Sequence, residues 1–499
     1  MNRPLLALLS RLSYGGYIQE ESSENSHGFV ETLARVYERA RNALEYRADN
    51  LVRRAAVERI LKRMMLMTKD PDKISGHLLT ELRWAKYITS EEVKNGFKSK
   101  LPKILEKYTS YEGVVPSDWV AKIASAEIEE LFNLNTDYKQ FTFFAFQVIR
   151  QKVKITDDNL DLITYFAVDK VYAESDNEQI AYHILKLAGE NISKEKFEEA
   201  WRLFNLAKSH KETSRLNKFV RRQMPPLVLL RDTYFYSPAT FRRALGNKEG
   251  FEKEARAALE TQLKLMSKKI STAGVRSVIY VFLTKMILAF GLEVPFEIFW
   301  YDKLNTLPLV LNLAFPPILM WITTSQIGLP SKKEQAALIQ RSWYITENFE
   351  SLGREEDVIG DSVEERRGIL WGIFTFLYAA FFVGVFWAIY YFLGKIGYTF
   401  FSKVIFIFFL TIIAFFAYRI SQIAKVYSWK DAKQSPSFME IISLPILAIG
   451  SRLSQGLSHL NFLAFAFDFI LEAPFKIILR FVDDWVQFLS LKREEQIIE

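Results

Sequence analysis

The sequence predicts an all-α membrane protein in which a helical cytoplasmic domain precedes a bundle of about four transmembrane helices and a C-terminal amphipathic segment. Three observations support this fold class. Long uncharged apolar runs lie in the C-terminal half, apolar residues recur at helical spacing in the N-terminal half, and the two halves differ in charge. The mean hydropathy of +0.01 is therefore an average over two unlike parts.

The positive charge of the chain belongs to its N-terminal half. Residues 277–499 hold 19 Lys and Arg against 21 Asp and Glu, whereas residues 1–276 hold 46 against 37 and carry a net charge of +9. A basic domain beside a membrane is attracted to anionic lipid head groups. The chain has no cysteine, which excludes disulfides, thiolate metal sites and a cysteine nucleophile.

Two runs without any charged residue predict transmembrane helices. One run of 28 residues separates Lys303 from Lys332, and another of 27 residues separates Arg367 from Lys395. Each exceeds the ~20 apolar residues that cross a hydrocarbon core of ~30 Å. The spans predicted from these runs are residues 306–327 and 369–393.

Two further apolar segments predict the remaining spans. Residues 400–420 carry basic residues only near their ends, where long side chains can reach the interface. Residues 277–300 are apolar but contain Lys285, Glu293 and Glu297. We interpret 277–300 as the first span. The alternative is a re-entrant hairpin that this segment forms with 306–327.

The basic residues of the connecting segments predict the orientation. The short links 301–305 and 394–399 each carry one lysine, whereas the N-terminal half and the links 328–367 and 419–433 are rich in Lys and Arg. Basic loops stay in the cytoplasm, so we expect a multi-pass protein with both termini cytoplasmic. The predicted regions are an N-terminal segment (1–27), a basic helical domain (28–272), a transmembrane domain (273–433) and C-terminal amphipathic helices (434–499).

The C-terminal region is apolar but is not expected to span. Charged residues recur there every fourth position and form one polar stripe on a helix, namely Asp468, Glu472, Lys476, Arg480 and Asp484. Such a helix lies in the interface plane or packs on the cytoplasmic domain, and we leave both alternatives open. The run Ala464–Lys476 resembles the tail of multi-pass bacterial membrane proteins, which implies a bacterial inner membrane.

A basic helix face is predicted within residues 28–67, where apolar residues recur at steps of three and four. Its candidate lipid-facing residues are Arg35, Arg39, Arg53, Arg54, Arg59, Lys62 and Arg63. We favour a solvated face whose charges pair along the helix, with anionic lipid contact as the alternative. Nucleic acid is disfavoured, because no recognised binding motif accompanies the charge.

No motif for catalysis or for cofactor binding is found. The five histidines lack a second ligand at a standard zinc spacing, and no phosphate-binding glycine loop or nucleophile elbow occurs. We therefore predict no catalytic, cofactor-binding or metal-binding residues, and a protein that is not an enzyme.

Lys285, Glu293 and Glu297 form the sharpest candidate site. Their spacing by multiples of four places them broadly on one side of the first span. Charged residues at membrane depth usually face a bundle interior or an aqueous cavity. They could form a proton, ion or solute path, with Gly291 and Pro295 loosening the backbone. Alternatively the span is short or tilted and the charges lie near its two ends, which we favour at this point.

Small residues recur in fours along the third span, at Gly368, Gly372, Ala380, Gly384 and Ala388. They allow close helix packing within the bundle, which we favour, or between copies in a homo-oligomer. Our first functional hypothesis is a non-enzymatic scaffold or adaptor that recruits a protein partner to the lipid bilayer. The alternative is a channel or secondary transporter that uses the charges of the first span.

Overall fold

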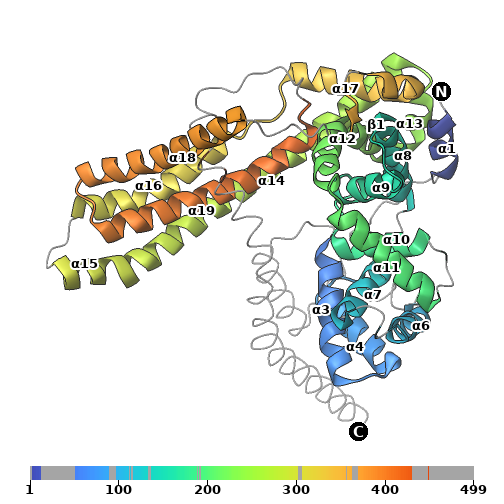
Figure 1. The fold of residues 1–499 in the computed structure, drawn as a ribbon, viewed down its shortest axis with the longest axis horizontal. Helices are drawn as coiled ribbons and strands as arrows, with labels where there is room; N and C mark the ends of the chain where they lie inside the picture. The colour runs from blue at the N-terminus through green and yellow to red at the C-terminus, as the bar shows by residue number, and fades with distance from the viewer. Residues whose placement is uncertain are drawn as a thin grey trace, which may run out of the picture. The chain divides into compact units, whose positions relative to one another are not determined.

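The computed structural model of this chain is built almost entirely of α-helices (Figure 1). It describes residues 3–12, 51–88, 97–111, 113, 116–132, 136–187, 189, 193–301, 306–355, 357–361, 369–429, 445 and 448. These residues divide into two compact units. The helical unit comprises the described residues up to Gln223 together with Glu350–Gly360, and the bundle unit comprises Met224–Phe349 and the described residues from Asp361 onward.

The helical unit is an array of helices in which chain neighbours pack on one another. The pairs α3–α4, α6–α7, α8–α9 and α10–α11 are in contact, and α7 also packs on α3 and α10. Its helices are α1 (Arg3–Arg11), α3 (Val52–Met67), α4 (Pro71–Trp84), α6 (Lys98–Thr109), α7 (Ser117–Phe132), α8 (Thr136–Lys152), α9 (Leu160–Val171), α10 (Asn177–Leu187), α11 (Lys194–Ser209) and the first part of α12 (Thr213–Tyr236).

Local chemistry explains how these helices start and what they bury. Asp70 caps α4 by accepting the backbone N–H groups of Asp72 at 3.0 Å and Lys73 at 3.4 Å, which satisfies donors that have no partner within the helix. In the interior, the rings of Tyr111 and Phe197 stack with their centroids 4.5 Å apart. Aromatic burial of this kind supplies much of the apolar area that stabilises a helical core.

The helical unit is closed by a segment that comes from far along the chain. This return segment, Glu350–Gly360, contains most of η4 (Phe349–Arg354) and the short strand β2 (Ile359–Gly360), which pairs in parallel with β1 (Val153–Lys154). Lys152, which is buried, holds the segment through Asp357 at 2.7 Å and Glu355 at 2.8 Å. The Lys152 ammonium also donates to the Gln223 side chain at 3.0 Å. The strand pair and the contacts of Lys152 thus join α8 and the return segment into one unit.

The bundle unit contains the long apolar helices. α14 (Lys248–Leu288), the π-helical turn η3 (Ala289–Glu293) and α15 (Val294–Tyr301) follow without a break. α16 and α19 both pack on α14 and on each other, and Figure 1 shows these helices running side by side. The other elements of this unit are the rest of α12, α13 (Pro238–Ala244), α16 (Thr306–Ser325), α17 (Lys332–Glu347), α18 (Ile369–Lys395), α19 (Phe400–Ala424) and η5 (Lys425–Tyr427).

Four helices of the bundle unit are long and apolar enough to cross a membrane. The predicted spans 306–327, 369–393 and 400–420 correspond to α16, α18 and α19, and the span 277–300 lies within the continuous helix from Lys248 to Tyr301. α16 alone has 20 residues, or about 30 Å at 1.5 Å per residue. Both arms of the alternative hairpin are therefore long enough to span.

The bundle unit begins at Met224, because α13 and the long helix from Lys248 pack with the spans. The predicted start of the transmembrane domain at 273 stays a prediction. Among the described residues nothing packs on α18 at Gly372 and Gly384, since a Cβ atom at either position would meet no atom within 4 Å. Residues 13–50, and all of 434–499 apart from 445 and 448, lie outside the described residues, and so does the predicted C-terminal stripe.

The Lys152–Asp357 contact predicts a pH-dependent contribution to stability. Burial raises the pKa of Asp357, but hydrogen bonds from Lys152 and Gln223 outweigh it and lower this pKa to about 2. The folded carboxyl thus titrates below the unfolded one, so its stabilisation is present above about pH 4 and is lost as pH falls towards 2. We expect Asp357→Asn to lower the thermal midpoint of the full chain at pH 5, with the difference from wild type vanishing near pH 2.

The matched control is Asp161→Asn, whose carboxylate is 78% exposed. This substitution should change the midpoint little at either pH, because exposed ion pairs contribute little. If the thermal midpoint of the wild type exceeded that of Asp357→Asn by the same amount at pH 2 as at pH 5, the ionised Asp357 carboxylate would not be the source of the stabilisation.

Candidate functional site

Six polar side chains meet inside the bundle unit, and all but one are completely buried. We call this set the bundle cluster. Lys285, Glu293, Asn312, Ser402 and Glu297 are each at most 2% exposed, and Thr399 is half-buried. Its members come from five elements, namely Lys285 from α14, Glu293 from η3, Glu297 from α15, Asn312 from α16, and Thr399 and Ser402 from the start of α19.

Glu293 is the centre of the cluster. Its Oε2 atom accepts a hydrogen bond from Lys285 Nζ at 3.1 Å, and its Oε1 atom accepts from Asn312 Nδ2. The Lys285 ammonium also lies 5.0 Å from the ring centroid of Phe409, a cation–π distance. This carboxylate is therefore compensated by one full positive charge and by an amide dipole.

Glu297 lies on the other side of a shared serine. Ser402 Oγ is 2.6 Å from Glu293 Oε1 and 2.8 Å from Glu297 Oε1. Thr399, the N-cap residue of α19, donates from Oγ1 to Glu297 Oε1 at 3.1 Å and accepts the backbone N–H of Ser402. Among the described residues, the Glu297 carboxyl thus contacts hydroxyl groups only and no positively charged side chain.

The π-helical turn explains how Lys285 reaches Glu293. Eight residues of regular α-helix make about 2.2 turns, which predicts only a loose pair. A π turn contains more residues per revolution, so η3 brings the two residues closer to two whole turns and onto one face. Pro295 favours this widening, because it lacks an N–H group and its ring clashes with the carbonyl four residues earlier, that of Gly291.

The three charged residues lie at different levels along the bundle. Glu297 contacts Thr399, which precedes the first residue of α19, so the glutamate end lies near an end of the predicted spans. Lys285 lies level with Phe409, about ten residues further along α19. All three charged side chains point inward, and the cluster runs as a polar stripe from the end of the bundle towards its middle.

Three members of the cluster were not anticipated from the sequence. Asn312 interrupts an otherwise apolar stretch of α16, and a polar amide in such a stretch is the one signal that could have identified it. Thr399 and Ser402 look like ordinary N-terminal helix residues, and only the tertiary contact identifies them as carboxylate partners. The Oδ1 atom of Asn312 is buried and has no hydrogen-bond partner among the described residues.

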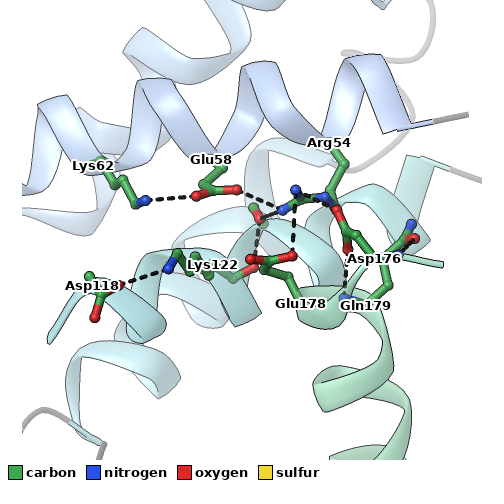
Figure 2. A network of polar contacts seen from close by, with 9 residues as sticks. Arg54, Glu58, Lys62, Asp118, Lys122, Asp176, Glu178 and Gln179 are labelled. Carbon is green, nitrogen blue, oxygen red and sulfur yellow. Dashed lines mark hydrogen bonds and ion pairs between the residues drawn. The ribbon is translucent and has the colours of Figure 1, made fainter. Parts of the chain in front are cut away.

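The predicted basic face of α3 is largely internal. Figure 2 shows Arg54 between Glu58 of its own helix and the carboxylates of Asp176 and Glu178. This guanidinium is 1% exposed, and it pairs with Glu58 at 2.8 Å and with Asp176 at 2.5 Å. It also donates to Ser125 Oγ at 3.1 Å. Arg54 therefore cannot present its charge to a lipid surface.

The remaining basic residues of α3 mostly join neighbouring helices. Arg53 forms a bidentate pair with Glu129 of α7, and Arg63 pairs with Glu81 of α4 at 2.5 Å. Lys62, with 40% of its side chain exposed, pairs with Glu58 of its own helix. Arg59 is half-buried, while Arg35 and Arg39 lie outside the described residues. These residues do not form one exposed face, because α3 packs on both α4 and α7 and so buries more than one of its sides.

We expect removal of the Arg54 charge to lower the free energy of unfolding far more than removal of the Lys62 charge. Burial raises the pKa of Asp176 to about 6 even beside Arg54, and this side chain is 17% exposed. Arg54→Met leaves the carboxylates of Glu58 and Asp176 without their shared cation, and we expect a loss of about 3–5 kcal/mol in the free energy of unfolding. Lys62→Met, the control on the same helix, should change it by less than about 1 kcal/mol. Urea unfolding of the full chain in detergent, followed by near-UV circular dichroism, measures both, and equal effects would contradict this role.

Comparison with known proteins does not assign the chain to a family. No family model, no curated protein and no solved structure matches it. Among the described residues, no group of three or more His, Cys, Asp or Glu side chains is arranged to hold a metal ion. The bundle cluster is therefore the feature from which a function has to be argued.

Proposed function

We propose that the protein is a multi-pass protein of the bacterial inner membrane whose bundle unit moves a monovalent cation, as a channel or secondary transporter. In this proposal the helical unit and both termini are cytoplasmic. The four apolar helices support the membrane location. The excess of Lys and Arg in residues 1–276, and in the links on the same side as these residues, supports the orientation.

The observation that carries the proposal is the buried bundle cluster. Two carboxyl groups and one ammonium lie inside a bundle of apolar helices, with exposures of 2% or less. Charges at membrane depth cost several kcal/mol and in membrane proteins mark ion pathways and proton relays. A purely structural bundle would be more stable with apolar residues at these positions, because buried ion pairs rarely repay their desolvation.

The charge balance of the cluster favours a cation over an anion. With both glutamates ionised the cluster carries one excess negative charge, and the acceptor oxygen of Asn312 is also without a donor. Such a site attracts a small cation and repels anions. Hydroxyl, amide and carboxylate oxygens are ligands that suit a proton or a hard monovalent cation.

A membrane-anchored scaffold is the second candidate. It is favoured by the size of the helical unit and by the aromatic interior of this unit, because four spans hold a chain in the membrane without such a domain. Because the return segment Glu350–Gly360 completes this unit, a partner search should use the full chain in membranes. Failure of crosslinking to find any specific partner of the full chain would count against the scaffold.

Flux measurements on the full chain in lipid vesicles test the transport proposal. We expect cation-dependent flux, measured with a pH-sensitive dye and with sodium- and potassium-sensitive dyes. Glu293→Gln should reduce it at least ~10-fold, because Lys285 then lacks its counter-charge, and Glu297→Gln should do the same by removing an exchangeable carboxyl. The control Glu260→Gln, on the exposed face of α14, should retain the wild-type rate. Absence of wild-type flux for every cation tested would overturn the proposal.

A further inference from the structure

The serine between the two glutamates sets a limit on how the cluster can be protonated. Ser402 Oγ lies 2.6 Å from one carboxyl oxygen and 2.8 Å from the other. Both distances are typical of a full O–H···O hydrogen bond. A serine hydroxyl has one hydrogen to donate, so it can satisfy only one of the two contacts. The other contact requires a hydrogen supplied by a carboxyl group.

The surroundings of the two carboxyl groups decide which one carries that hydrogen. Glu293 accepts from the Lys285 ammonium at 3.1 Å and from the Asn312 amide, and both partners favour its ionised form. Glu297 contacts only the hydroxyl groups of Thr399 and Ser402. Desolvation without a nearby cation favours the neutral form of a carboxyl group.

We infer that the bundle cluster is a proton-binding site in which Glu297 holds an exchangeable proton and donates it to Ser402, while Glu293 stays ionised beside Lys285. Each of these hydrogen bonds then has one donor hydrogen. Glu297 donates to Ser402 Oγ, Ser402 donates to Glu293, and Lys285 and Asn312 donate to Glu293. The cluster is neutral in this state, which removes the cost of an uncompensated buried charge. The inference deepens the proposed function by naming the cation as a proton, and its physiological meaning rests on that function.

Other ionisable groups near the cluster do not alter this balance. Lys403 of α19 is turned towards α18, where its ammonium lies 4.2 Å from the ring centroid of Tyr390. Lys395 lies over the ring of Tyr391. Tyr398 packs in an apolar group with Leu393 and Phe406. Among the described residues, Lys285 is thus the only cation in contact with the two glutamates.

Among the described residues of the cluster, only the one at the Thr399 end is partly exposed. Thr399 is half-buried and contacts Glu297, so hydroxyl groups lead from Glu297 towards the turn before α19. At the opposite end Lys285 lies over the ring of Phe409, which is fully buried, and Val281, one turn earlier on α14, is fully buried too. On release, the O–H bond of Glu297 breaks and water at the Thr399 end takes the proton. The cluster then carries one negative charge until a proton returns.

The unpartnered oxygen of Asn312 is an independent indication of a ligand. The Asn312 side chain is completely buried, its nitrogen donates to Glu293, and its Oδ1 atom accepts from no described residue. A buried acceptor without a donor costs about 1–3 kcal/mol. A water molecule or hydronium ion arriving at the cluster would satisfy it.

Infrared spectroscopy of the full chain in lipid vesicles tests the inference. We expect a carboxylic acid C=O stretching band at pH 7.5 that shifts in D2O, is absent in Glu297→Gln and persists in Glu260→Gln. Because Gln mimics the neutral carboxyl group, Glu297→Gln should keep the thermal midpoint of the wild type, whereas Glu293→Gln should lower it. Should Glu297→Gln fail to fold, Ser402→Ala answers the same question, since loss of the shared hydroxyl must shift the band.

Two outcomes would overturn the inference. One is the absence of a protonated carboxyl band in the wild type at pH 7.5. The other is a band that Glu293→Gln removes and Glu297→Gln does not. Flux of sodium or potassium without such a band would refute proton binding and leave the proposed function intact. A band without flux of any cation would support proton binding and refute the proposed function.

Discussion

The buried contact between Lys285 and Glu293 is the interaction on which the arrangement of the bundle depends. Its charges lie 3.1 Å apart with no exposed surface, so neither could remain ionised in an apolar bundle without the other. The pair requires the widened turn η3, and it requires α16 and α19 to bring Asn312 and Ser402 to the same carboxylate. Three helices are thereby held in one register by polar groups, whereas apolar contacts alone would allow them to slide or rotate.

A similar principle operates in the helical unit, with different consequences. Arg54 and Lys152 are each about 1% exposed and each gathers several carboxylates. Their partners lie on segments far apart in the chain, so these cations join elements that have few other reasons to meet. In these networks every carboxylate contacts a cation. Glu297 in the bundle differs, because among the described residues it contacts hydroxyl groups only.

Sequence patterns predicted the helices better than they predicted the contacts between helices. The bounds of α18 and α19 follow from uncharged runs and flanking basic residues, and Lys285, Glu293 and Glu297 stand out because charges are rare in such runs. Thr399 and Ser402 could not be found in this way, because neutral polar residues at the start of a helix carry no periodic signal, and Asn312 is marked only as an amide within an apolar stretch. The burial of Arg54 was also missed, since the pattern of one helix does not show that α4 and α7 cover two of its sides. The pairing of Val153 with Ile359 joins residues too distant for any local rule.

The most direct test of the account is to determine from which side of the membrane the polar stripe can be reached. The chain has no cysteine, so single cysteines placed at Ile396, Thr399 and Glu260 report without background. The account predicts that an impermeant thiol reagent labels positions 396 and 399 only from the side opposite position 260. Labelling of position 399 from the same side as position 260, or from neither side while position 396 reacts, would contradict a one-sided cation site within the bundle.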